Sequence, residues 1–204
     1  LYISLGCAVE NIAVTARQNG YRPEVNLDTD KAGTTIIRIT LKADETVEGD
    51  PLYAYIDQRQ STRNAYRPYA VPAESLDALT RAADFPGIRL MGFHGPNAIA
   101  DLMPFIIEGS NRQFNNPAFV RELVQWIRFS KKEAERRQDG IRGASMGFPA
   151  IPRWMGKAIM EYMVNAKSEA KRWRKLLDAT SGLFLFLAEA HDEQHWVTLG
   201  RAFQ

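Results

Sequence analysis

The apolar positions of residues 1–19 recur at the spacing of an amphipathic helix. Apolar residues recur every three or four positions and form one stripe, made of Leu5, Ala8, Val9, Ile12, Ala13 and Ala16. Gly20 follows them, and a glycine adopts the left-handed conformation that ends a helix at little cost. The pattern therefore predicts a helix over residues 1–19 that stops at Gly20.

Beyond Gly20 the pattern predicts strands and helices in mixed order. Residues 22–27 and 34–41 are typical of strands, because the second segment is rich in β-branched residues and turn residues bound it. Two further strands are predicted at 87–93 and 183–190. Helices are predicted over the ranges 51–59, 71–83, 96–108, 117–137, 157–177 and 192–204. In the helix at 117–137 the inward residues are expected to be Phe119, Leu123, Trp126 and Ile127.

Residues 139–156 fit no regular element. The segment DGIRGASMGFPAIPRWMG holds four glycines and two prolines among apolar side chains. Loops of this length in compact domains are uncommon and usually functional. We therefore predict a long ordered loop or lid.

Composition and charge narrow the classes of partner. The chain has 204 residues, 45% of them hydrophobic, and a formal net charge of +2, which favours neither nucleic acid nor an anionic membrane as partner. The single cysteine, Cys7, excludes an internal disulfide framework and is expected to be a small buried apolar residue. No apolar run approaches the roughly 18 residues that cross a bilayer. We expect a cytoplasmic protein, although an export signal preceding Leu1 stays open.

Two heptapeptides far apart in the chain are alike. SLGCAVE begins at Ser4 and TLGRAFQ at Thr198, and their glycines, Gly6 and Gly200, are 194 positions apart. Chance similarity between two amphipathic helices is one explanation, and an internal repeat is the other. A repeat predicts that the helix at 1–19 and the helix that holds Gly200 pack together near a pseudo-two-fold axis, with the two glycines allowing close approach.

The segment around residue 59 is the best candidate for a ligand site. Arg59, Ser61 and Arg63 form an R-x-S-x-R pattern, and V-P-x-E-x-L-x-x-L begins at Val71. Two guanidinium groups and a hydroxyl group can converge on one phosphate through charge-assisted hydrogen bonds. On spacing alone, a solvated helix end with unpaired arginines is the favoured interpretation, because the pattern is common.

These motifs together resemble the FMN-dependent nitroreductase superfamily. The R-x-S-x-R pattern, the V-P-x-E-x-L-x-x-L segment, the two similar heptapeptides and LFLFLAEAHDEQHW carry the resemblance, over most of 1–110 and 180–204. Two partial copies in one chain resemble the Acg-like subgroup, in which two repeats are fused into an internal pseudo-dimer. The resemblance implies an α+β fold with a mostly antiparallel sheet flanked by long helices. It further implies that residues 1–49 end a first repeat and residues 50–204 form the second, with a lid-like insertion at about 139–156.

The resemblance also implies an FMN site. The R-x-S-x-R motif of the family binds the flavin phosphate, so it assigns that role to Arg59, Ser61 and Arg63. Asn111, within GSNRQFN, resembles the asparagine that hydrogen-bonds the isoalloxazine edge. An N-cap or loop role ahead of Pro117 is the alternative for Asn111. One family feature is missing, because Ala82 to Pro86 lead straight into the next strand where a P-S-x-x-N-x-Q-P-W loop is expected.

The activity that the resemblance implies is that of an FMN-dependent oxidoreductase. Such an enzyme takes hydride from NAD(P)H and reduces a nitroaromatic or quinone-like acceptor on the cofactor. No side-chain acid or base is obligatory, so no catalytic residue is assigned. A redox-silent flavin-binding or flavin-storage protein with a lid over FMN is the alternative, and a decayed flavin site in an interaction domain is a third. Homo-oligomerisation beyond the internal pseudo-dimer stays open.

Other motifs receive plainer interpretations. His191 and His195 have the spacing of a zinc-binding H-E-x-x-H motif, but Asp192 replaces its glutamate and no third ligand follows. Asp192 is instead expected to cap the last helix. The charged segments 131–137 and 167–175 are expected to be solvated helix faces, with no metal or nucleic acid bound.

Overall fold

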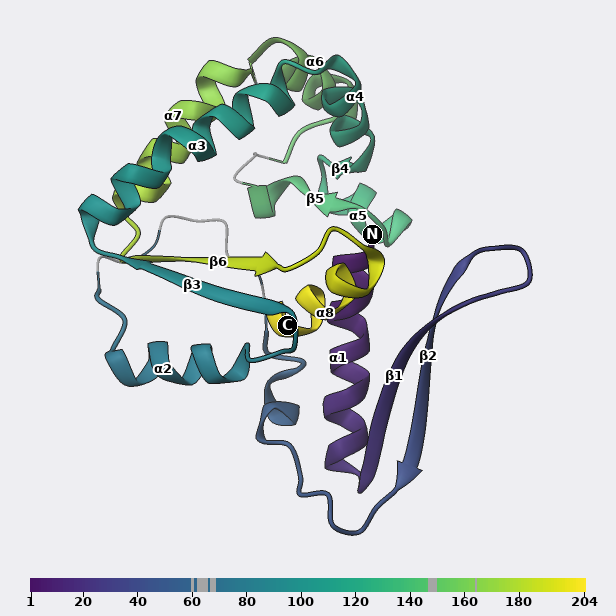
Figure 1. The fold of residues 1–204 in the computed structure, drawn as a ribbon. Coiled ribbons are helices and arrows are strands. Elements are labelled where there is room, and N and C mark those ends of the chain that lie inside the picture. Colours follow the sequence, from purple (N-terminus) through teal and green to yellow (C-terminus); the bar gives the residue numbers. More distant parts are fainter. Residues whose placement is uncertain (60, 62–65, 67–68, 147–149, 164) are drawn as a thin grey trace. The chain divides into compact units, whose positions relative to one another are not determined.

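The computed structural model describes residues 1–59, 61, 66, 69–146, 150–163 and 165–204. Its fold is α+β, with helices and small sheets in mixed order (Figure 1). Contacts divide the chain into two compact units. Unit 1 comprises Leu1–Gln60, Pro72–Gly92 and Phe184–Gln204, and unit 2 comprises Ser61–Val71 and Phe93–Leu183.

Unit 1 is organised around two packed helices and a hairpin (Figure 1). Helix α1 (Tyr2–Gln18) packs against α8 (Glu193–Phe203), and strand β1 (Tyr21–Thr29) pairs antiparallel with β2 (Thr35–Ala43) beside α1. Gly20 has a φ of 75° between α1 and β1, as predicted. Unit 1 also contains the 3-10 helix η1 (Pro51–Tyr55), α2 (Ala73–Ala82) and most of the two strands described below. The predicted helix over 51–59 is therefore a shorter 3-10 turn.

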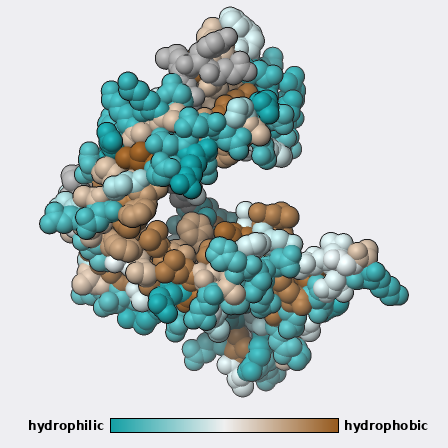
Figure 2. Space-filling model, turned by 45° about the horizontal axis from the view of Figure 1, so that its top comes forward, coloured by the Kyte–Doolittle hydropathy of each residue, from teal (hydrophilic) through white to brown (hydrophobic). Residues whose placement is uncertain are grey.

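The buried face of α1 differs from the predicted stripe. Val9, Ala13 and Ala16 are buried as expected, but Leu5, Ala8 and Ile12 are exposed. The helix turns its glycine-bearing face, not the centre of its apolar stripe, toward α8. Large apolar side chains thus reach the surface, and Figure 2 shows hydrophobic residues among hydrophilic ones on the drawn face.

A second two-stranded sheet joins β3 (Ile88–His94) and β6 (Gly182–Ala188), the strands predicted at 87–93 and 183–190. The N–H of Glu189 donates to the carbonyl of Gly87 at 3.0 Å, and that of Gly95 donates to the carbonyl of Ser181 at 3.5 Å. These hydrogen bonds at the two ends of the pair run in the antiparallel sense.

Unit 2 contains more breaks than the periodicity predicts. In place of one helix over 117–137 it has α4 (Pro117–Trp126), strand β4 (Ile127–Arg128) and α5 (Lys131–Arg137). In place of one helix over 157–177 it has α6 (Arg153–Met163) and α7 (Ala166–Asp178), and α7 packs against α3 (Pro96–Phe114). Ser130 and Asn165 cause these breaks, since each is extended and its side chain caps the helix that follows. The S-x-x-E spacing at 130–133 is a sequence pattern that marks such a start.

The core of unit 2 lies where α4, β4 and α6 meet. Its buried members are Val124, Ile127, Phe129 and Met160. Ile127 is fully buried as expected, whereas Trp126, expected to point inward, is 49% exposed. The helix ends at Trp126, so the chain turns there and the next residues, not the tryptophan, enter the core. Strand β4 pairs in parallel with β5 (Ile141–Arg142), unlike the two antiparallel pairs.

No helix within the described residues combines the length and the apolarity needed to cross a membrane.

Candidate functional site

Gly6 and Gly200 face each other where α1 packs against α8. A Cβ atom on Gly6 would overlap the carbonyl oxygen of Val197 and lie 2.9 Å from the Cα of Gly200. A Cβ atom on Gly200 would overlap the carbonyl oxygen of Ile3 and lie 3.0 Å from the Cα of Gly6. The two helices touch backbone to backbone, which only glycine permits at these positions. The predicted packing of the two helices through their glycines is confirmed.

The contacts across this helix pair are reciprocal. Gly6 contacts Val197, and Gly200 contacts Ile3. Ile3 and Val197 are 194 positions apart, as are Gly6 and Gly200, so the two contacts are equivalent. Tyr2 and Trp196, again 194 positions apart, have ring centroids 5.9 Å from each other. A local two-fold relation between the helices produces this set of contacts.

Polar side chains also connect α1 and α8. The carboxylate of Glu10, 7% exposed, accepts hydrogen bonds at 2.8 Å from Arg17 on its own helix and from Arg201 on α8. Arg17 also donates to Asp50 at 2.8 Å, so two guanidinium groups and two carboxylates form one network that compensates the buried charge of Glu10. Cys7, expected to be a buried apolar residue, is only partly buried, and its thiol donates to the carbonyl of Gly200 at 3.3 Å.

The structure does not show whether Arg59, Ser61 and Arg63 converge on one site. Arg59 is exposed in unit 1, with its guanidinium carbon 5.6 Å from the ring centroid of Phe203 in α8. Ser61 is exposed and belongs to unit 2. Arg63 lies outside the described residues. Arg59 forms no ion pair with any residue that the structure describes.

Asn111 lies inside α3 and not in the loop ahead of Pro117. The N-cap before Pro117 is Asn116, whose side chain accepts from the backbone N–H of Ala118 at 2.9 Å. The N-cap and loop alternatives for Asn111 are therefore wrong, because α3 continues to Phe114 beyond its predicted end at residue 108.

Asp192 caps α8 as predicted. Its carboxylate accepts the backbone N–H of His195 at 2.8 Å and lies 2.8 Å from His195 Nδ1. The backbone hydrogen bond is the main reason why the pKa of Asp192 falls below its ordinary value. Among the residues that the structure describes, no three His, Cys, Asp or Glu side chains gather as a metal site would require.

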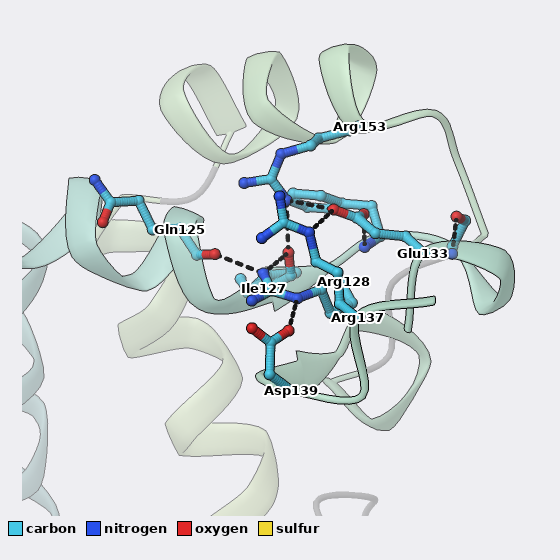
Figure 3. A network of polar contacts seen from close by, with 9 residues as sticks. Gln125, Ile127, Arg128, Glu133, Arg137, Asp139 and Arg153 are labelled. Carbon is cyan, nitrogen blue, oxygen red and sulfur yellow. Dashed lines mark hydrogen bonds and ion pairs between the residues drawn. The ribbon is translucent and has the colours of Figure 1, made fainter. Parts of the chain in front are cut away.

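A buried polar network in unit 2 was not predicted (Figure 3). The side chain of Arg128 is 2% exposed, and it donates to Asp139 at 2.7 Å and to the carbonyl of Gln125 at 2.6 Å. Glu133 is also buried, accepting from the backbone N–H of Phe129 at 3.2 Å and from Arg153 at 2.7 Å. The expectation that 131–137 is a solvated face is thus wrong for Glu133. Its place three residues after Ser130 is the sequence feature that could have identified it.

The second half of the segment 139–156 packs against the core of unit 2. It contains β5, the 3-10 helix η2 (Gly143–Met146) and the start of α6, so the expected lack of regular structure is wrong. The N–H of Ile151 donates to the carbonyl of Phe129 at 3.2 Å, and Gly156 lies against the Phe129 ring. Residues 147–149 of this segment lie outside the described ones. Contacts with Phe129 and the pairing of β5 with β4 hold the described part of the segment.

The Asp139–Arg128 pair makes the stability of the protein depend on pH. The hydrogen bond from Arg128 is the main reason why the pKa of Asp139 lies below its ordinary value of 3.8. A depressed pKa in the folded state stabilises the fold above the ordinary pKa, and this stabilisation is lost as pH falls through the folded-state pKa. We expect Asp139→Asn to lose less stability than the wild type between about pH 5 and about pH 2, measured by urea unfolding. Equal losses in the two proteins would show that the pair does not couple folding to pH.

Comparison of the chain with protein-family models, with curated proteins and with solved structures finds no match.

Proposed function

We propose that the protein binds FMN in a fused two-repeat fold of nitroreductase type and reduces nitroaromatic or quinone-like acceptors with NAD(P)H. The reciprocal packing of α1 against α8 carries this proposal, because residues 194 positions apart contact one another as a two-fold relation requires. The resemblance in the sequence assigns such a helix pair to the centre of a pseudo-dimer. In this proposal residues 1–49 belong to the first repeat and residues 50–204 to the second.

Arg59, Ser61 and Arg63 are assigned to the FMN phosphate and Asn111 to the edge of the flavin ring. The guanidinium of Arg59 is exposed, and a ring is its partner in the described part of the chain. Stacking on a ring leaves the in-plane N–H donors of an arginine available for phosphate oxygens. Guanidinium and hydroxyl donors are the groups that bind phosphate oxygens, which supports the assignment. Bound FMN would supply the redox chemistry, while these side chains bind and orient it.

The packing of residues 139–156 favours the oxidoreductase over the flavin-storage alternative. Storage depends on this segment closing over the flavin as a lid. Ile151 and Gly156 hold its second half against Phe129, and β5 pairs with β4. A segment with such contacts opens only by losing buried contacts of unit 2, so a fixed structural role suits it better.

The test is FMN binding by the purified protein, followed by quenching of flavin fluorescence. We expect Arg59→Ala with Arg63→Ala to weaken FMN binding at least about a hundredfold, since each charge-assisted contact contributes about 1.5–3 kcal/mol. Arg22→Ala with Arg38→Ala is the matched control, because these arginines pair with Asp44 and Asp28 on the hairpin surface. Equal affinities of the wild type and the Arg59/Arg63 variant would reject the phosphate site. Oxidation of NAD(P)H with a quinone then separates an enzyme from a flavin store.

A further inference from the structure

A groove with a volume of about 410 Å³ runs along α4 in unit 2. The helix contributes Phe119, Glu122, Leu123 and Trp126, which occupy positions i, i+3, i+4 and i+7 and therefore share one face. Gly140 and Ile141 form the opposite wall. The size falls within the range of sites that bind small organic molecules.

The backbone at Gly140 takes a conformation and a position that favour glycine. Its φ is 73°, a conformation that favours glycine. A Cβ atom there would overlap the carbonyl oxygen of Trp126 and lie 2.9 Å from the guanidinium carbon of Arg128. The backbone at residue 140 can therefore lie this close to the end of α4 only because glycine has no side chain.

The lining combines aromatic rings with one free carboxylate. Trp126 is 49% exposed, and the ring of Phe119 is oriented by an edge contact with Phe114, their centroids 5.7 Å apart. Glu122 is exposed and forms no ion pair with any described residue. Apart from this carboxylate, the groove is lined by apolar side chains and Gly140.

The guanidinium group of Arg128 lies next to the groove but does not make the groove positively charged. Arg128 lies under Gly140, but its side chain is 2% exposed and its Nε donates to Asp139 at 2.7 Å. It is thus compensated and shielded from a ligand in the groove. Among the described residues that line the groove, Glu122 is the charged one.

We propose that this groove binds a small organic cation of the alkylammonium or arylammonium class. The ammonium group lies between the carboxylate of Glu122 and the face of Trp126, where Coulomb attraction and the ring quadrupole both favour a positive charge. The apolar part of the ligand covers Leu123 and Ile141. This site is independent of the proposed flavin site.

Isothermal titration with benzyltrimethylammonium tests the proposal, because that cation keeps its charge at every pH. Benzenesulfonate and benzyl alcohol are the anionic and neutral probes of similar size. We expect the cation to bind at least about tenfold more tightly than either of them, as an aromatic face with a carboxylate predicts. Equal binding of the three probes, or no binding of the cation, would overturn the proposal.

Substitutions locate the site. We expect Trp126→Ala to weaken binding of the cation about tenfold and Glu122→Gln about fivefold, while Trp126→Phe retains more affinity than Trp126→Ala. Trp154→Ala and Glu135→Gln are the matched controls, since both residues are exposed in unit 2 outside the groove. Circular dichroism establishes that each variant is folded. Unchanged binding in folded Trp126→Ala, or equal losses in the control variants, would also overturn the proposal.

Discussion

Gly6→Ala is expected to destabilise unit 1 by about 3 kcal/mol or more. The new Cβ atom would overlap the carbonyl oxygen of Val197 and crowd the Cα of Gly200, and a backbone contact cannot be relieved by a change of rotamer. The helices α1 and α8 would have to separate, which would also break the ion pair between Glu10 and Arg201. For a chain of this length we expect the melting temperature to fall by about 6–12 °C, measured by circular dichroism or calorimetry.

Gly109→Ala is the matched control for this substitution. Gly109 is also a helical glycine, but a Cβ atom there would meet nothing within 4 Å. Alanine is the better helix former, so this variant should gain up to about 1 kcal/mol. The two glycine-to-alanine substitutions should therefore change stability in opposite directions. A gain in both variants would contradict the close packing of α1 against α8.

Arg128→Ala is expected to cost about 1–3 kcal/mol, the loss typical of leaving a buried hydrogen-bonding group without its partner, because Arg128 is buried whereas Asp139 is 46% exposed. The side chain supplies Nη1 to the carbonyl of Gln125, at the end of α4, and Nε to Asp139. Its removal leaves that carbonyl without this donor and opens a cavity beside the core. Urea unfolding followed by near-ultraviolet circular dichroism measures the loss.

Arg121→Ala serves as the control for Arg128→Ala. Arg121 is exposed on α4, the helix that ends just before Arg128, and no ion pair joins it to another described residue. Such a surface substitution usually changes stability by less than about 0.5 kcal/mol. Similar stabilities of the two variants would mean that the network of Figure 3 contributes little to the fold.

Local patterns predicted the features that depend on neighbours along the chain. Runs of apolar and β-branched residues predicted the strands of the hairpin and the strands β3 and β6. Gly20 could be predicted because it takes the positive φ that ends a helix, and Asp192 because its side chain makes the hydrogen bond that begins one. The two similar heptapeptides also predicted a long-range contact, between Gly6 and Gly200. They could do so because a two-fold relation places equivalent residues near a common axis.

The tertiary structure alone decided which side of each element is buried. The apolar stripe of α1 did not show that Leu5 and Ile12 would be exposed, because burial depends on the element that packs against a helix. A helical period likewise continues through 117–137, but the capping hydrogen bond of Ser130 and the burial of Glu133 are available only where the chain turns into the core. Spacing is a property of the sequence, whereas solvent exposure and ion pairing depend on distant residues that the fold brings together.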